Sequence, residues 1–183
     1  MTCFLSENTT GASNEECRFS CEFRKYAAHF SFEVKDEDII SPYLTDNEDI
    51  WQGDAVEVFL SPDGDRTRYF ELQVSPFGVR FWGEVINRDG KTPQLKKLPP
   101  MFQAKAERTE AGYKVHIELP YGELGAVLPE RMAFNAFRLD KKEDGRQLLY
   151  ALSPTFSDSF HRPQYFVRAK EQLAECSFTA CPS

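Results

Sequence analysis

The sequence predicts an all-β fold, an antiparallel β-sandwich with at most one or two short helical turns. Segments in which apolar and polar residues alternate recur at short spacing, which is the two-residue period of half-buried strands. Turns that contain proline and glycine separate these segments. No helical segments are available to connect parallel strands, so a parallel α/β fold is excluded. Aromatic residues make up 14% of the chain, which also favours pleated, half-buried surfaces.

The first half of the chain contains five predicted strands. They cover residues 17–25, 27–35, 54–60, 68–74 and 79–86. In the third of these, Glu57 and Phe59 lie on the face opposite to the aliphatic residues, because successive side chains of a strand alternate. The segment 36–49 is polar, acidic and interrupted by Pro42, which is typical of a long loop that carries function.

The second half contains five more predicted strands, covering residues 102–109, 113–120, 132–140, 147–153 and 165–169. The first two form a hairpin across EAG, and the next two pair across KKEDG. The proline-rich segment 91–100 is a predicted connector, and YGELGAV is the predicted helical turn. We expect a single domain over residues 1–183, with its core at about 17–169 and a weakly helical or disordered tail at 170–183.

Charge and hydropathy exclude several classes of partner. The net charge is −7 and the basic residues are scattered, so we expect no nucleic acid and no anionic membrane surface as partner. No stretch approaches the ~20 apolar residues of a membrane span. The start, MTCFLSENTTGASNEE, lacks the basic and apolar regions of a signal peptide. This predicts a cytoplasmic protein, or an extracellular or periplasmic one whose leader has been removed, and leaves the oligomeric state open.

The five cysteines lie near the two ends of the chain. Cys17 and Cys21 are expected on one face of a strand, and four residues at ~3.3 Å each hold them too far apart for a disulfide. A bridge from the N-terminal region to Cys176 or Cys181 is conceivable, and an odd count leaves at least one thiol without a partner in the chain. We expect buried, unreactive thiols.

Five stretches in a fixed order resemble one known family. They are IWQGDAVEVFLSPDGD, RYFELQVSPFGVRFW, AGYKVHIELPYGELG, FNAFRLD and YALSPTFSDSFHRPQYF. Together, from about Phe30 to about Phe166, they resemble a family-9 carbohydrate-binding module, part of the DOMON-like superfamily of β-sandwiches that bind sugars or haem. The resemblance implies a jelly-roll-like sandwich that binds a saccharide, at its chain end, without cutting it and therefore without catalytic residues.

The resemblance also implies a clamp of two aromatic rings around one sugar, with polar groups that bind its hydroxyls. Trp51 stands six residues before Glu57, which is the family's spacing between the first ring and a hydroxyl-binding glutamate. The second ring comes from the late loop, PTFSDSFHRP (residues 154–163). Just before this loop, relatives carry a tryptophan where this chain has Leu152. Phe156 or Phe160 is therefore the expected second ring.

Residue types alone support the same kind of site. Sugar recognition needs a flat apolar ring and forked hydrogen-bonding groups, which carboxylates, amides and guanidinium groups supply. The alternative for Trp51 is a core or rim aromatic without a binding role. The second tryptophan, Trp82, lies in an alternating strand and is expected in the core. The candidate sugar-binding residues are Trp51, Asp54, Glu57, Arg80, Phe156, Asp158, Phe160, His161 and Arg162.

Acidic loops raise the question of a metal. Hard carboxylate oxygens suit calcium, which occurs as a structural ion in the family that the chain resembles. The candidate ligands are Asp36, Asp38, Asp63 and Asp65, and the alternative is a solvated acidic loop. The histidines belong to no spaced metal motif, and His29 and His116 are expected to be structural.

Three other functions compete with a sugar-binding module. Paired carboxylates leave room for a glycoside hydrolase, or a domain of one, although the small size favours binding. A module that has lost its sugar site would serve as a protein-interaction domain. A DOMON-type haem domain requires axial methionine and histidine, and Met101 and Met132 have no evident histidine partner.

Overall fold

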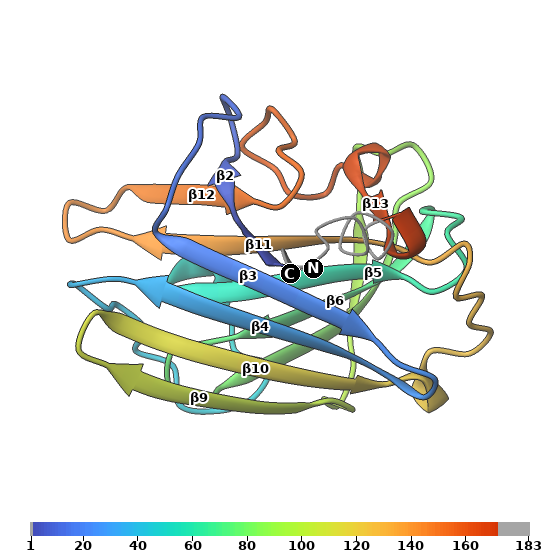
Figure 1. Ribbon diagram of the computed structural model, residues 1–183, viewed down its shortest axis with the longest axis horizontal. Coiled ribbons are helices and arrows are strands. Elements are labelled where there is room, and N and C mark those ends of the chain that lie inside the picture. The colour runs from blue at the N-terminus through green and yellow to red at the C-terminus, as the bar shows by residue number, and fades with distance from the viewer. Residues whose placement is uncertain (1, 172–183) are drawn as a thin grey trace, which may run out of the picture.

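The computed structural model, which describes residues 2–171, consists of two antiparallel sheets packed face to face (Figure 1). The predicted all-β antiparallel sandwich is confirmed. Within the described residues, no helix is long and apolar enough to cross a membrane. Residues 2–171 contain three 3-10 turns, one more than expected, at Ile50–Gln52, Tyr121–Glu123 and Pro163–Tyr165.

The first sheet has five strands in the order β1-β3-β4-β10-β9. Its inward side chains are apolar and its outward ones polar, which is the alternation that the sequence showed. The predicted hairpin between β9 and β10 is confirmed by a continuous antiparallel register. The strands are β1 (Thr2–Phe4), β3 (Cys17–Phe23), β4 (Ala27–Lys35), β10 (Gly112–Pro120) and β9 (Gln103–Thr109).

The second sheet has eight strands, in the order β2-β12-β11-β5-β6-β7-β8 with β13 beside β11. Figure 1 shows the N-terminal strand β2 lying next to β12, so two segments that are far apart in the sequence meet at this edge. The strands are β2 (Ser6–Glu7), β12 (Gln147–Ala151), β11 (Ala133–Lys141), β5 (Ala55–Ser61), β6 (Arg68–Val74), β7 (Arg80–Ile86), β8 (Gln94–Lys97) and β13 (Val167–Arg168).

The eight-stranded sheet is covered on both faces. Its inner face packs on the first sheet, where Trp82 is buried with its ring stacked on Phe70 at 5.0 Å between centroids, so the predicted core position is confirmed. Its outer face carries a second apolar cluster around Phe59 and Phe137, closed by the late loop through Phe160. Every residue of β5 is buried as a result.

Three short strands differ from the expectations. The segment 91–100 contains β8, whose four residues are all exposed, and β1 and β2 precede residue 17. Cys17 and Cys21 lie buried on one face of β3, as predicted. Cys176 and Cys181, and most of the expected tail, lie outside the described residues.

Candidate functional site

The outer face of the eight-stranded sheet carries a pocket of about 550 Å³. Its floor comes from alternate residues of two neighbouring strands, which point the same way. Glu57 of β5 lies opposite Gln73 of β6, and Phe59 lies opposite Glu71. The two glutamates are therefore diagonal neighbours on the same face of the sheet.

The first wall of the pocket is Trp51, which is 47% exposed and lies in the 3-10 turn that precedes β5. The alternative of a core tryptophan is therefore wrong. Gln147 holds the turn, because its Nε2 donates to the carbonyl oxygens of Trp51 at 2.7 Å and Gly53 at 3.2 Å. A Cβ at Gly53 would lie 2.6 Å from the carbonyl oxygen of Ile40, so only glycine allows this close approach.

The opposite wall is the late loop, which contributes Asp158, Phe160 and His161. The N-terminal segment anchors this loop. The buried side chain of Asn8 donates to the Ser157 carbonyl oxygen at 2.7 Å and accepts from the Thr155 amide at 2.9 Å. Asn8 is a positioning residue that the sequence did not reveal, because its partners lie about 150 residues away.

The two floor carboxyls are almost inaccessible, with Glu57 2% and Glu71 4% exposed. Burial raises the pKa of Glu71 to about 7. Burial, and then the neighbouring Glu71 carboxylate, raise the pKa of Glu57 well above its usual range. Two such groups titrate as a pair, so at neutral pH the pair retains a proton and carries less than two negative charges.

A chain of hydrogen bonds orients His161 above this pair. Asn87 Nδ2 donates to the Tyr69 hydroxyl oxygen at 3.3 Å, which leaves that hydroxyl free to donate to His161 Nδ1 at 2.8 Å. The imidazole proton is then on Nε2, which lies 3.6 Å from Glu71 Oε2. Burial lowers the pKa of His161 to about 4, so the ring is neutral at neutral pH.

Two buried acceptors of the floor have no hydrogen-bond donor among the described residues. They are Gln73 Oε1 and Glu71 Oε2. The Nε2 of Gln73 donates to the Glu71 carboxylate, and the side-chain oxygen of Gln73 remains available to a ligand. Buried polar atoms without partners are rare in folded proteins, and here both belong to residues that line the pocket. A ligand with hydroxyl or amine donors would satisfy them.

The pocket brings together five of the nine candidate sugar-binding residues: Trp51, Glu57, Asp158, Phe160 and His161. It also contains residues that were not expected, above all Glu71 and Gln73. Their signal was present in the strand RYFELQV, where both alternate with Leu72.

The other four candidates do not line this pocket. Arg80 forms an ion pair with Asp46 at 2.6 Å and donates to the carbonyl oxygen of Phe102 at 2.9 Å. The ring of Phe156 is 59% exposed beside Tyr165. Asp54 accepts hydrogen bonds from the backbone amides of residues 40 and 141. Arg162 donates to the hydroxyl oxygen of residue 157.

Comparison with known families gives one decisive match. A family model described as "Carbohydrate family 9 binding domain-like" matches residues 4–170. The chain belongs to this carbohydrate family 9 binding domain-like family. The resemblance stated from the sequence is thereby confirmed over nearly the whole chain. A search of curated proteins found no match.

Three solved structures share the fold of this family 9-like domain. One is a candidate carbohydrate-binding protein from Bacteroides uniformis, with a TM-score of 0.72 and 15% identity over 91% of this chain and 84% of that one. Two are family 9 modules from Caldicellulosiruptor kristjanssonii, each 16% identical. The complex with cellotriose has a TM-score of 0.64 over 88% of this chain and 77% of that one. The complex with glucose has a TM-score of 0.63 over 89% of this chain and 81% of that one.

The family 9-like domain also contains a buried acidic triad, Asp36, Asp54 and Asp140, whose carboxylate oxygens lie within 4.8 Å of one another and which offers oxygen ligands to an ion. A cation of the protein itself already lies there. The buried guanidinium of Arg138 is 3.3 Å from both Asp36 and Asp140, and Lys142 Nζ is 2.9 Å from Asp140. Burial still raises the pKa of Asp54 to about 6.

The four predicted calcium ligands do not come together. The Asp36 carboxylate accepts from the backbone amide of Asp38 at 3.1 Å, within its own turn. Asp63 accepts from the Asp65 amide at 3.0 Å, in a turn next to β5. Such contacts are typical of carboxylates that stabilise loops.

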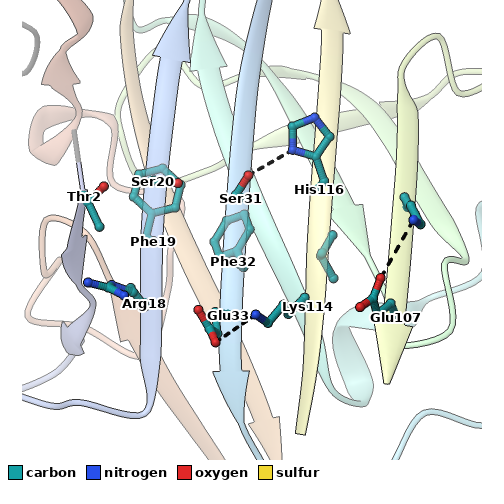
Figure 2. Close-up of a pocket in the computed structure, with 12 residues that line it drawn as sticks. Thr2, Arg18, Phe19, Ser20, Ser31, Phe32, Glu33, Glu107, Lys114 and His116 are labelled. Atoms are coloured by element: carbon teal, nitrogen blue, oxygen red, sulfur yellow. Dashed lines mark hydrogen bonds and ion pairs between the residues drawn. The ribbon is translucent and has the colours of Figure 1, made fainter. Parts of the chain in front are cut away.

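A second hollow of about 580 Å³ lies on the outer face of the five-stranded sheet (Figure 2). Its charged side chains largely satisfy one another, since Lys114 pairs with Glu33 at 3.0 Å and Lys105 with Glu107 at 3.8 Å. The two phenylalanine rings in its lining, Phe19 and Phe32, are buried beneath the surface. Among the described residues, the lining of this hollow therefore offers no exposed phenylalanine, tyrosine or tryptophan ring to a sugar.

The carboxyl pair predicts a pH effect on stability. Unfolding lowers the pKa of Glu71 from about 7 to its ordinary 4.5, so the folded state holds more protons between these values and stability falls as the pH rises. Relative to that of wild type, the free energy of unfolding of Glu71→Gln should increase by about 1–3 kcal/mol when the pH is raised from about 5 to about 8. Urea unfolding at both pH values measures this gain.

The glutamine variant retains the groups that face residue 71, which are Glu57, His161 and Tyr69. The neutral His161 contributes nearly equally to the stability of both proteins. Glu107→Gln, which removes an exposed carboxylate on the other sheet, should give no pH-dependent difference. The expected effect would be contradicted if the difference in stability between Glu71→Gln and wild type were the same at both pH values.

Proposed function

We propose that this domain binds carbohydrate, without cleaving it, in the pocket between Trp51 and the late loop. The observation that carries the proposal is an exposed tryptophan ring beside a buried floor whose acceptors lack donors. Sugars present an apolar C–H face and a set of hydroxyl donors, which are the two features that this pocket complements. Membership of the family, and the glucose and cellotriose complexes of two structural neighbours, support the same function.

Phe160, rather than Phe156, is the second aromatic residue of the proposed site. It lies in the pocket lining and its ring stacks on Phe137 with 4.1 Å between centroids. This packing fixes Phe160 before a ligand arrives, which reduces the entropy lost on binding. The wall that it forms is lower than a tryptophan would provide, so Trp51 supplies the larger stacking surface.

Isothermal titration calorimetry with glucose and cellotriose tests the proposal. We expect saturable binding of one ligand per chain and quenching of tryptophan fluorescence by both sugars. The same samples should release no reducing sugar from cellotriose on prolonged incubation, because the domain binds without hydrolysis. An absence of binding at millimolar sugar, with the fold intact by circular dichroism, would refute the proposed function.

We infer that Arg138, not calcium, is the counter-ion of the acidic triad. Calcium prefers six to eight oxygen ligands, whereas here a guanidinium and the Lys142 ammonium face the carboxylates. Both Asp54 oxygens already accept from backbone amides. Addition of calcium or of EDTA should therefore shift the melting temperature by less than about 1 °C. A stabilisation by calcium that EDTA reverses would contradict this inference.

A further inference from the structure

The proposed sugar pocket is lined by four acidic residues, Asp49, Glu57, Glu71 and Asp158, and by no lysine or arginine. Lys97 lies at the rim of the pocket. It binds the Asp49 carboxylate at 2.8 Å and lies over the Phe81 ring at 5.4 Å, so it neutralises the rim and not the floor.

The floor itself contains an excess of acceptors. Glu71 Oε2 and Gln73 Oε1 lack a donor among the described residues, and the Glu57 carboxyl is buried on the same floor, while the neutral His161 offers one N–H. A neutral sugar hydroxyl donates once, whereas a protonated amine donates up to three times and carries the missing positive charge. Hydrogen bonds between an ammonium and a carboxylate are also stronger than those between neutral groups.

A buried carboxylate pair without a cation is an unfavourable arrangement, because ionising the second group requires an uncompensated charge away from water. A ligand ammonium placed beside Glu57 and Glu71 would allow both to ionise and would form charge-assisted hydrogen bonds with them. A ligand carboxylate at the same place would be repelled, since no lysine or arginine lines the pocket to receive it.

We propose that this pocket selects sugars that carry a protonated amine, with glucosamine as the simplest example, over neutral sugars and over sugar acids. The inference rests on the proposed function and names the ligand class of the same site. The amine binds at the Glu57–Glu71 pair, the sugar ring lies against Trp51, and a hydroxyl donates to Gln73.

Calorimetric titration near neutral pH compares glucosamine, glucose, N-acetylglucosamine and glucuronate. We expect glucosamine to bind about tenfold more tightly than glucose. N-acetylglucosamine, in which the amine is no longer charged, should lose this advantage, and glucuronate should bind more weakly than glucose. Equal affinities for glucosamine and glucose would overturn the inference and leave the proposed function standing. Binding of none of the four sugars would overturn both.

Two variants locate the selectivity. Glu71→Gln keeps the shape of the side chain and should reduce the affinity for glucosamine to that for glucose; Glu57→Gln provides the same test through the other member of the pair. Asp144→Asn is the control, because Asp144 is exposed, pairs with Arg146 and lies outside the pocket. Persistence of the full preference in both glutamine variants, with their folds verified by circular dichroism, would overturn the assignment to this pair.

Discussion

Replacement of Trp51 by alanine should weaken sugar binding at least about tenfold, equivalent to about 1.4 kcal/mol, while the fold remains intact. The indole is half exposed and forms the larger apolar wall of the proposed site, so its removal deletes stacking area without opening the core. Gln147 binds the backbone carbonyl of Trp51, which alanine retains, so the turn should keep its shape. Calorimetry with glucose or glucosamine measures the loss, and circular dichroism verifies the fold.

Phe77→Ala is the matched control for this variant. Phe77 is also an exposed aromatic residue, in the turn between β6 and β7, but it does not line the pocket. We expect its removal to leave the affinity unchanged. Equal affinity of wild type and Trp51→Ala would place the sugar elsewhere on the domain.

Replacement of Arg138 by methionine should destabilise the domain by about 3–5 kcal/mol in urea unfolding. The guanidinium is fully buried and lies 3.3 Å from two of the three buried carboxylates, so the variant leaves negative charge without its main counter-ion. The deficit should become smaller toward acid pH, because burial raises the pKa of Asp36 and its protonation then removes part of the uncompensated charge.

Arg146→Ala is the control for Arg138, since it breaks an ion pair at the surface, and its expected effect is below about 1 kcal/mol. Lys142→Met, which removes the half-exposed cation of the same cluster, should give an intermediate loss and remains measurable if Arg138→Met does not fold. A change below about 1 kcal/mol in both Arg138→Met and Lys142→Met would show that the cluster needs no internal counter-ion.

The sequence was sufficient for the central strands and insufficient for the edges of the sheets. Central strands such as β5 and β10 have one consistently apolar face, and that alternation is visible in the sequence. The four residues of β8 are exposed on both faces, so QLKK carries no alternation, and the flanking prolines indicate a connector. Strands β1 and β2 are three and two residues long, which is too short for any periodicity.

The site was predictable where spacing along one segment determines it. Trp51 and Glu57 belong to one turn and the strand that follows, and they reach the same pocket. Arg80 has the right chemistry for a sugar contact and is the nearest match to an arginine of the resembled family. Its neighbour Phe81 lines the pocket instead, because successive residues of a strand face opposite sides. Glu71 was not predictable, because an outward glutamate normally meets water and only the folded chain shows that the late loop covers it.

The buried pair Glu57–Glu71 bears on the history of the domain. A lineage that no longer bound a ligand would gain stability at neutral pH by exchanging either glutamate for a neutral residue. Burial raises the pKa of both carboxyls, so keeping them protonated in the folded state costs free energy at neutral pH. Natural proteins lie close to their stability threshold, so such exchanges would be accepted readily. This chain has both carboxyls, at the bottom of a pocket with an exposed tryptophan at its rim, which is the arrangement expected of a domain that binds the proposed ligand.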